Sequence, residues 1–211
     1  MRKLFYSAVL FAATMIAVTS CDKNNDEKTD IREQAVGDYN VTYTTYISDG
    51  NTYELLEKNK EAVTGTISID GEGLKLIVNG DIVNMDNIAE ASNGFTFDIK
   101  NMTFFDDGKA ITLNGYNGYE LKATDGTKTS HHGGYISDKK TLEFYVTRPK
   151  EELLATIAQY LIANDEKLTE TLKELEEAGN QIDIHAFYLQ SESAAAKKYN
   201  VVIMEISCVK K

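Results

Sequence analysis

The residues with the clearest potential for chemistry are three histidines, His131, His132 and His185. A metal site needs several ligands that converge on one point. Neighbours on a strand point to opposite faces, so only a loop would bring His131 and His132 onto one ion, with Asp125 or Asp138 nearby. We expect no metal and no other cofactor. His131 and His132 are weak candidate ligands, and solvated loop histidines are the alternative.

Sequence motifs of the common enzyme classes are absent. The chain has no Gly-x-Ser-x-Gly elbow, no phosphate-binding loop and no dinucleotide fingerprint. It has no calcium-binding loop, because Asp49-Gly50-Asn51 and Asp106-Asp107-Gly108 are better interpreted as turns. Three histidines and many serines leave a Ser-His-Asp arrangement open, and 33 acidic residues do not single out a catalytic pair. We predict no catalytic residue and no enzyme activity; a hydrolase is the less favoured alternative.

Two groups of aromatic residues are candidates for ligand contact. The first would line the inside of a barrel around a small apolar ligand: Tyr39, Tyr43, Phe95, Phe97, Phe144 and Tyr188. The alternative is that they simply fill a small core. The second group is a loop face of Tyr116, Tyr119 and Tyr135, suited to sugars or peptides. Its alternative is two turns and the edges of a hairpin, and the absence of tryptophan weakens a glycan platform.

Strands must position these residues. From Tyr39 to Ile47 apolar and aromatic residues occupy most odd positions and polar residues the even ones, with Tyr46 as the exception. Such alternation is typical of a strand with one buried face. Further strands are expected at 63–69, 74–78, 95–99, 110–113, 119–121 and 142–146. Turn signals separate them, including Asp70–Gly73 and Asn79-Gly80, which favours an antiparallel barrel or sandwich.

After Pro149, the only proline, the spacing of the apolar residues changes from that of a strand to that of a helix. Two stripes at helical spacing predict two helices within residues 150–178, with a break at Asn164-Asp165 and an end at Gly179. Residues 150–178 hold eight acids and three lysines. This acidic face is either a solvated outer face or a docking surface for a basic partner.

Two strands are expected to finish the chain, at 182–190 and 201–209. His185 would be a hydrogen-bonded residue in the first. The second has apolar residues on both faces, which suggests a strand covered on both sides. Cys208 lies in this apolar run and is expected to be a buried, inert thiol.

The first twenty residues have the pattern of a secretory signal peptide. Arg2 and Lys3 precede an uncharged apolar run to Ser20. The run ends Val18-Thr19-Ser20-Cys21, which resembles a bacterial lipobox with valine at the usual leucine position. We expect lipid on Cys21; a plain secretory signal is the alternative. Residues 21–34 are predicted to be a flexible acidic tether, followed by a single folded domain at 35–211.

The charge composition limits the kinds of partner that the protein can bind. The 211 residues carry a net charge of −11, and removing Arg2 and Lys3 with the signal gives 20 − 33 = −13. Affinity for nucleic acid comes from basic residues that neutralise phosphates, so we expect no nucleic-acid partner.

The segment Ala35-Val36-Gly37-Asp38-Tyr39-Asn40-Val41 is similar to the opening of calycin-like and lipocalin-like domains, in which an aromatic residue follows Gly-x. With the lipobox, the acidic tether and the length, the chain resembles small lipocalin-like surface lipoproteins of gut bacteria, of unknown function. The resemblance implies no catalytic residues. A helical block before the final strands departs from a standard lipocalin. We therefore predict a mainly β (α+β) fold, an antiparallel lipocalin-like β-barrel or sandwich with a two-helix insertion before the last two strands.

These observations predict a lipid-anchored outer-membrane lipoprotein that faces the cell surface or the periplasm. An acidic stretch after the lipidated cysteine resembles an export signal and favours the surface. The expected role is non-catalytic binding of a small apolar ligand or an envelope component. The alternative is a structural or protein-interaction module that uses its acidic helices.

Overall fold

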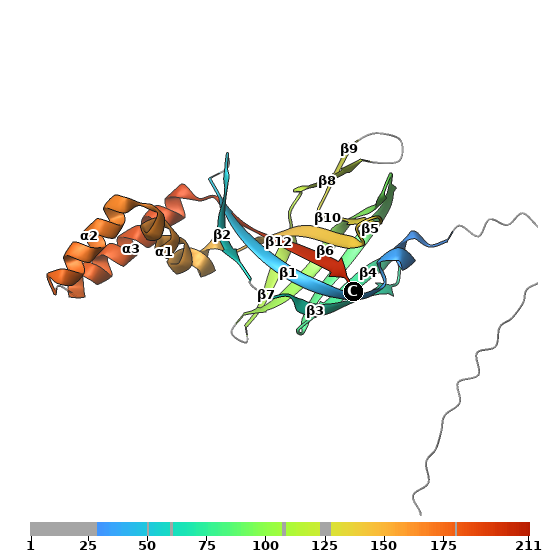
Figure 1. Cartoon of the computed structure of the whole chain (residues 1–211), viewed down its shortest axis with the longest axis horizontal. Helices are drawn as coiled ribbons and strands as arrows, with labels where there is room; N and C mark the ends of the chain where they lie inside the picture. The colour runs from blue at the N-terminus through green and yellow to red at the C-terminus, as the bar shows by residue number, and fades with distance from the viewer. Residues whose placement is uncertain (1–28, 50, 60, 107–108, 123–127, 180) are drawn as a thin grey trace, which may run out of the picture.

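The computed structural model describes residues 29–49, 51–59, 61–106, 109–122, 128–179 and 181–211. Within them the chain is mainly β: an eight-strand antiparallel barrel closes on itself, and three α-helices extend from one end (Figure 1). The predicted fold class, an antiparallel barrel with a helical insertion, is confirmed. The predicted signal peptide, Cys21 and most of the tether lie outside the described residues.

The elements follow one another in this order: η1 (Ile31–Ala35), β1 (Gly37–Ser48), β2 (Tyr53–Lys58), β3 (Val63–Asp70), β4 (Gly73–Val78), β5 (Asp81–Ala91), β6 (Gly94–Asp106), β7 (Lys109–Gly115), β8 (Tyr119–Lys122), β9 (Lys128–His131), β10 (Gly133–Ile136), β11 (Thr141–Arg148), η2 (Lys150–Leu153), α1 (Leu154–Asn164), α2 (Glu166–Glu177), α3 (Gln181–Lys198) and β12 (Val201–Lys210).

The barrel wall runs β1-β3-β4-β5-β6 in one direction and β1-β12-β11 in the other. Two short strands share the one position between β6 and β11. β10 pairs with residues 94–97 of β6, and β7 pairs with residues 102–106 of the same strand. Both also pair with β11. The β8–β9 hairpin leaves the wall between these two half-strands (Figure 1).

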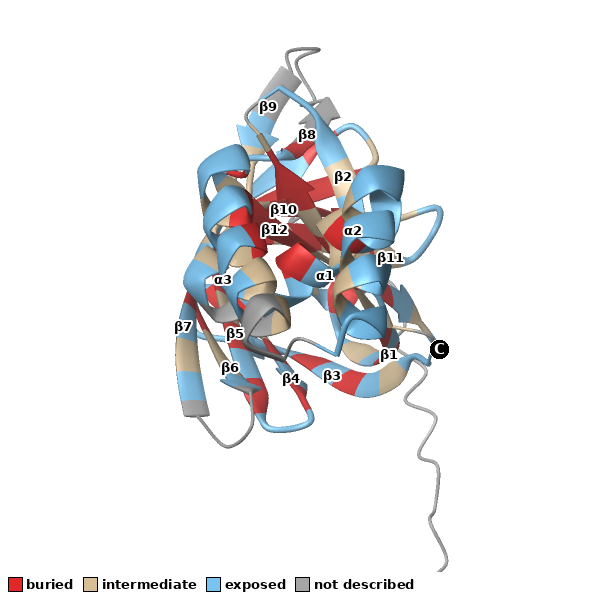
Figure 2. Ribbon diagram, turned by 90° about the vertical axis from the view of Figure 1, so that its left-hand side faces the viewer, coloured by how far each residue is buried: buried red, intermediate tan, exposed pale blue. Residues whose placement is uncertain are grey.

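The alternation along the strands separates the core from solvent. Tyr39 and Val41 of β1 are fully buried, whereas Asp38 and Asn40 beside them are exposed. Buried side chains from all eight wall positions form one cluster inside the barrel, and the buried strands stand out in the end-on view of Figure 2. The predicted turn at Asn79-Gly80 is confirmed, since both residues have the positive φ that a tight hairpin turn needs.

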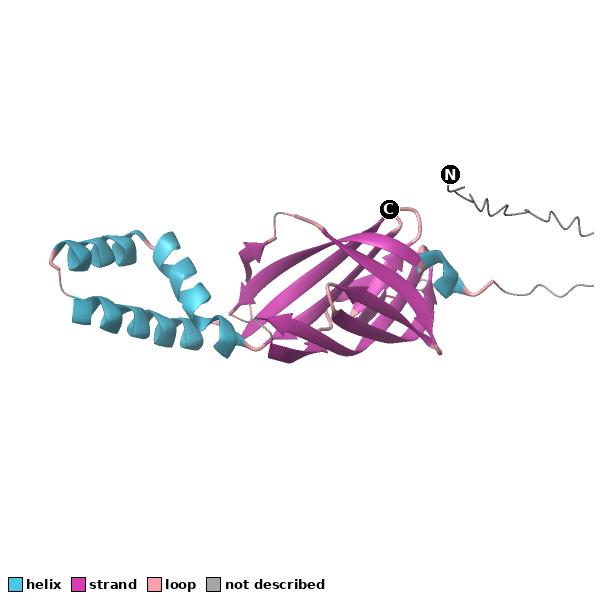
Figure 3. Ribbon diagram, turned by 90° about the horizontal axis from the view of Figure 1, so that it is seen from below, coloured by secondary structure: helices cyan, strands magenta, loops and turns pink. Residues whose placement is uncertain are grey.

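The short helix η1 closes the end of the barrel that is opposite the α-helices (Figure 3). Two interior tyrosines fasten it: the Tyr39 hydroxyl donates to the Ala35 carbonyl at 2.7 Å, and the Tyr135 hydroxyl donates to the Gln34 carbonyl at 2.8 Å. The prediction that the tether continues to residue 34 is therefore wrong at its end, because Ile31 packs against the barrel core and Ala35 is buried.

The helical insertion is longer than predicted. The expected break is confirmed at Asp165, whose side chain accepts hydrogen bonds from the first N–H groups of α2, and Gly179 follows α2 with φ +69°. The expected strand at 182–190 is wrong, because these residues lie in α3. The buried residues Ser191 and Ala195 are four apart, which is helical spacing. One strand, β12, therefore follows three helices.

A second apolar cluster joins the helices to the barrel. It consists of Ile47, Leu153, Ile157, Ala195, Tyr199 and Val202. Of the described helices, none combines the length and the apolarity that crossing a bilayer requires.

Candidate functional site

The aromatic residues predicted to line the barrel divide into three groups. Tyr39, Phe95, Phe97 and Phe144 are fully buried inside the barrel. The ring centroids of Phe97 and Phe144 are 6.2 Å apart, and those of Phe95 and Phe97 are 6.4 Å apart. These four side chains therefore pack as core, which is the alternative that the sequence left open.

Tyr43 and Tyr188 lie elsewhere. Tyr188 is on α3, where its ring packs edge-on against Phe187 at 6.2 Å. Tyr43 is half-buried and lines a cavity of about 300 Å³ at the end of the barrel that carries the helices. We call this space the mouth cavity. Its lining is Tyr43, Thr45, Glu57, Asn59, Asn79, Asp81, Phe104, Phe105, Arg148 and Met204.

Charged groups in the mouth cavity are held in place by the strands that end there. The Arg148 guanidinium, at the end of β11, lies 5.3 Å from the centroid of the Phe104 ring. Asp81, at the start of β5, is buried and accepts the backbone N–H of Phe105 at 2.9 Å. Burial raises the pKa of Asp81, and the Phe105 hydrogen bond opposes this only in part.

The mouth cavity offers two kinds of contact. A guanidinium over an aromatic ring presents planar N–H donors that match a carboxylate or phosphate. Phe104, Tyr43 and Met204 supply apolar surface beside it. This lining suits an amphipathic molecule with an acidic group better than a purely apolar one.

The three tyrosines predicted to form a loop face do not share one surface. Tyr135 faces the barrel interior and stacks on Phe95, with ring centroids 5.3 Å apart. Tyr119 is buried, and its ring lies 6.5 Å from that of Tyr145. Tyr116 lines a second cavity, of about 290 Å³, on the outside of the barrel.

The second cavity is lined mostly by residues that no sequence motif indicated. Its lining is Tyr46, Tyr53, Tyr116, Gly118, Tyr145, Ile203 and Glu205. One signal was present in the sequence, because Tyr46 breaks the polar series at even positions of β1. Tyr46 is half-buried in the folded chain although it lies on the face of β1 that points away from the core.

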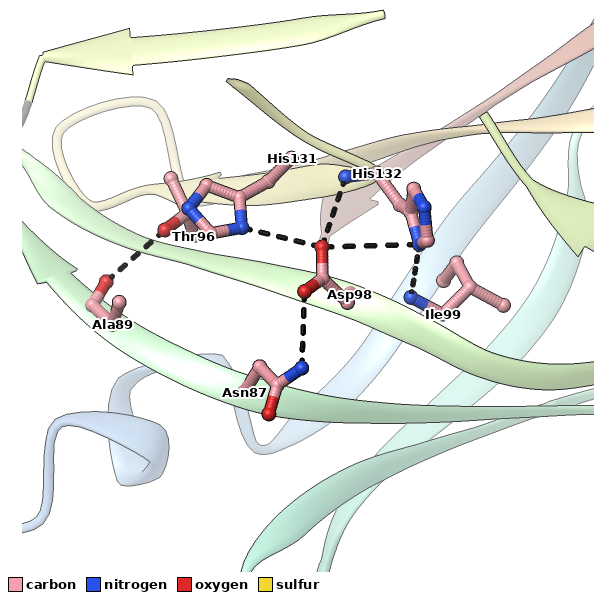
Figure 4. Close-up of polar contacts among 7 residues, drawn as sticks. All are labelled: Asn87, Ala89, Thr96, Asp98, Ile99, His131 and His132. Carbon is pink, nitrogen blue, oxygen red and sulfur yellow. Dashed lines mark hydrogen bonds and ion pairs between the residues drawn. The ribbon is translucent and has the colours of Figure 1, made fainter. Parts of the chain in front are cut away.

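His131 and His132 converge on Asp98 (Figure 4). The backbone bends at His132, and both rings approach Asp98 Oδ1, from Nδ1 of His131 at 3.2 Å and Nδ1 of His132 at 3.8 Å. Nδ1 of His132 accepts the backbone N–H of Ile99 at 2.8 Å. In the part of the chain that the structure describes, no group of three or more His, Cys, Asp or Glu side chains could hold a metal ion.

Asp98 is the centre of this polar cluster. Its Oδ2 accepts the side-chain amide of Asn87 at 3.1 Å, and its Oδ1 accepts the backbone N–H of His132 at 3.4 Å. Burial by itself raises the pKa of Asp98, but the hydrogen bonds from Asn87, His131 and His132 together lower it. The cluster ties β5 and β6 to the β9–β10 bend. The side chain of His185, the third candidate, lies outside the described residues.

Cys208 is fully buried inside the barrel, as predicted. Burial raises the pKa of its thiol well above the ordinary value. The thiolate, which is the reactive form, is therefore scarce at neutral pH.

Comparisons with protein-family models, with curated proteins and with solved structures found no match.

Proposed function

We propose that this protein is a non-catalytic binding protein of the bacterial cell envelope, held to the membrane by lipid on Cys21. Its ligand is a small amphipathic molecule with an acidic group, taken up at the mouth cavity. One observation carries the proposal: the Arg148 guanidinium is held over the Phe104 ring in a cavity at one end of a barrel whose interior holds a cluster of buried apolar side chains.

The shape of the barrel supports a binding role. η1 and the interior aromatic side chains close one end, so a ligand would enter from the end near the helices. A cavity of about 300 Å³ is at the lower limit of ordinary ligand sites, which favours a small ligand. The acidic group would lie on Arg148, and the apolar part on Phe104, Tyr43 and Met204.

Calorimetric titration with three probes of equal chain length tests this function. Octanoate is expected to bind, and octanol and octylamine are expected to bind at least about tenfold more weakly, a difference of about 1.4 kcal/mol. Arg148→Met should weaken octanoate by a similar factor while Arg148→Lys retains part of the affinity. Lys100→Met, an exposed substitution on β6, is the matched control.

Several outcomes would reject the site. No heat from octanoate at millimolar concentration would do so, as would equal affinity for all three probes. An Arg148→Met protein that binds octanoate like the wild type would also show that the guanidinium is not the anchor.

The envelope location is tested at the N-terminus. Mass spectrometry of the protein from its native membrane should show a diacylated or triacylated Cys21 as the first residue, and Cys21→Ala should move the protein out of the membrane fraction. An unmodified N-terminal residue would remove the lipid anchor from the proposal. Protease treatment of intact cells distinguishes the cell surface from the periplasmic side.

The helical extension favours a second candidate, a protein-interaction module. The helices reach away from the barrel (Figure 3), and α2 has no buried residue. Replacing Glu166, Glu170 and Glu174 with lysine should then abolish crosslinking to a partner protein in intact cells and leave octanoate binding unchanged. Unchanged crosslinking would reject this role for α2.

A further inference from the structure

A ring of tyrosines surrounds the second cavity, on the outer face of the barrel wall. Four of the seven described residues that line it are tyrosines, and we call these four, Tyr46, Tyr53, Tyr116 and Tyr145, the tyrosine cage. Tyr46 and Tyr145 come from β1 and β11, which are both paired with β12. Tyr53 comes from β2, and Tyr116 from the connection between β7 and β8.

Hydrogen bonds hold the cage together across long sequence distances. The hydroxyls of Tyr53 and Tyr116 are 2.7 Å apart and bond to each other. The backbone N–H of Tyr116 donates to the Tyr145 carbonyl at 2.9 Å. The cage is therefore anchored to the wall through Tyr145, and the Tyr53–Tyr116 hydrogen bond joins β2 to the β7–β8 connection.

Gly118 keeps space beside the rings. A Cβ atom there would lie 3.0 Å from the Tyr116 ring and 3.5 Å from the Tyr145 ring. Because glycine has no side chain, the space beside these two rings stays unfilled. A larger side chain would occupy the volume that a ligand would take.

Two carboxyl groups stand at the wall of the cage. Glu205 accepts the Tyr46 hydroxyl at 3.0 Å, and Glu143 accepts the Tyr145 hydroxyl at 3.1 Å. Burial raises the pKa of Glu143, and the neighbouring Glu205 carboxyl raises it further. Among the described residues that line the cavity, none is basic; Lys139, outside the lining, opposes part of the rise in the pKa of Glu143.

We propose that the tyrosine cage binds a quaternary or methylated ammonium group. The faces of aromatic rings carry negative electrostatic potential and attract such cations, most strongly where water is excluded. Glu205 places a carboxyl group beside the rings. The net charge of −11 also raises the local concentration of cations near the surface. This site is separate from the mouth cavity and does not depend on the function proposed above.

Calorimetric titration with choline and with 3,3-dimethyl-1-butanol tests the proposal, because the two have the same shape and differ in the charge. Choline is expected to bind, and the neutral alcohol to bind at least about tenfold more weakly. Tyr53→Ala, which changes an exposed side chain, should weaken choline about fivefold or more. Gly118→Val should abolish binding by filling the cage. Arg148→Met, at the mouth cavity, should leave choline affinity unchanged.

Equal affinity for choline and the neutral alcohol would overturn the proposal, as would absence of binding at millimolar choline. So would unchanged choline affinity in both Tyr53→Ala and Gly118→Val. Binding of a neutral disaccharide such as maltose in place of choline would assign the cage to sugars instead. If the wild-type protein binds choline but not octanoate, only the function proposed for the mouth cavity is rejected.

Discussion

His132 fills a gap in the barrel wall, and its replacement should weaken the barrel in a defined way. Residues 98–101 of β6 lie between the segment that pairs with β10 and the segment that pairs with β7. There the backbone N–H of Ile99 donates to Nδ1 of His132 at 2.8 Å. His132→Ala removes this acceptor, whereas His132→Asn places an amide oxygen at nearly the same distance from the backbone.

The expected loss follows from the burial of the donor. A buried N–H without an acceptor costs about 1–3 kcal/mol. The His132 side chain is 22 % exposed, so water can reach part of the gap. The lower half of that range, about 1–2 kcal/mol, is therefore expected for His132→Ala. Gly115 packs directly against the imidazole, so the lost ring also leaves a void.

Urea unfolding followed by far-ultraviolet circular dichroism measures this difference in a chain without tryptophan. With a slope of about 2 kcal/mol per molar urea, His132→Ala should lower the midpoint by about 0.5–1 M. His132→Asn should recover half of the loss or more. His131→Ala is the matched control, because its partly exposed contact with Asp98 should contribute less than about 1 kcal/mol.

Two results would refute the role of His132 as a substitute strand partner. One is an Ala variant whose midpoint equals that of the wild type. The other is an Asn variant that is as unstable as the Ala variant, which would show that ring packing, and not the hydrogen-bond acceptor, stabilises the gap.

Three further predictions concern other elements. The pKa of Glu143 is raised in the folded chain, so the folded chain binds a proton on this carboxyl more tightly than the unfolded chain does. The protonated carboxyl therefore stabilises the fold fully below the ordinary glutamate pKa, about 4.3. This stabilisation is lost as the pH rises through the raised pKa of Glu143. Urea melts from acid to neutral pH should show a flatter decline for Glu143→Gln, and an unchanged slope would contradict the raised pKa of Glu143 that its burial and the Glu205 carboxyl produce. Asp165→Ala removes the N-cap of α2 and should cost about 1 kcal/mol, seen as faster amide exchange confined to α2, with Asp165→Ser largely normal; exchange that rises equally in the barrel would count against a local cap. Gly133→Ala would place Cβ 2.5 Å from Cβ of Phe144 and should cost about 1–3 kcal/mol or more; an unchanged urea midpoint would show that the wall yields there.

Local patterns in the sequence were sufficient for much of the wall. Alternation along 39–47 predicted β1, and the turn at Asn79-Gly80 follows from residues that tolerate positive φ. The break between α1 and α2 was predictable because Asp165 interrupts an apolar stripe and is a good N-cap. In each case the evidence lies within a few consecutive residues.

Short apolar runs were less informative. The segment 182–190 has apolar residues at spacings that fit a strand as well as a helix, and tertiary packing decided for a helix that continues to Lys198. Tyr135 was predicted to lie on a surface, but the pairing of β10 with β6 and β11 directs its side chain toward the core. A strand pattern defines two faces without saying which one meets the interior.

By itself, then, the sequence determined that the chain forms antiparallel strands interrupted by acidic helices, because periodicity and turn chemistry act locally. Only the tertiary structure decided that β7 and β10 share one place in the wall, that His132 fills the gap between them, and that Tyr46, Tyr53, Tyr116 and Tyr145 surround one cavity. These features depend on the register between strands far apart in the chain and on the volumes of the side chains that meet there. Neither quantity is encoded within a short stretch of residues, since both arise when distant segments pack together.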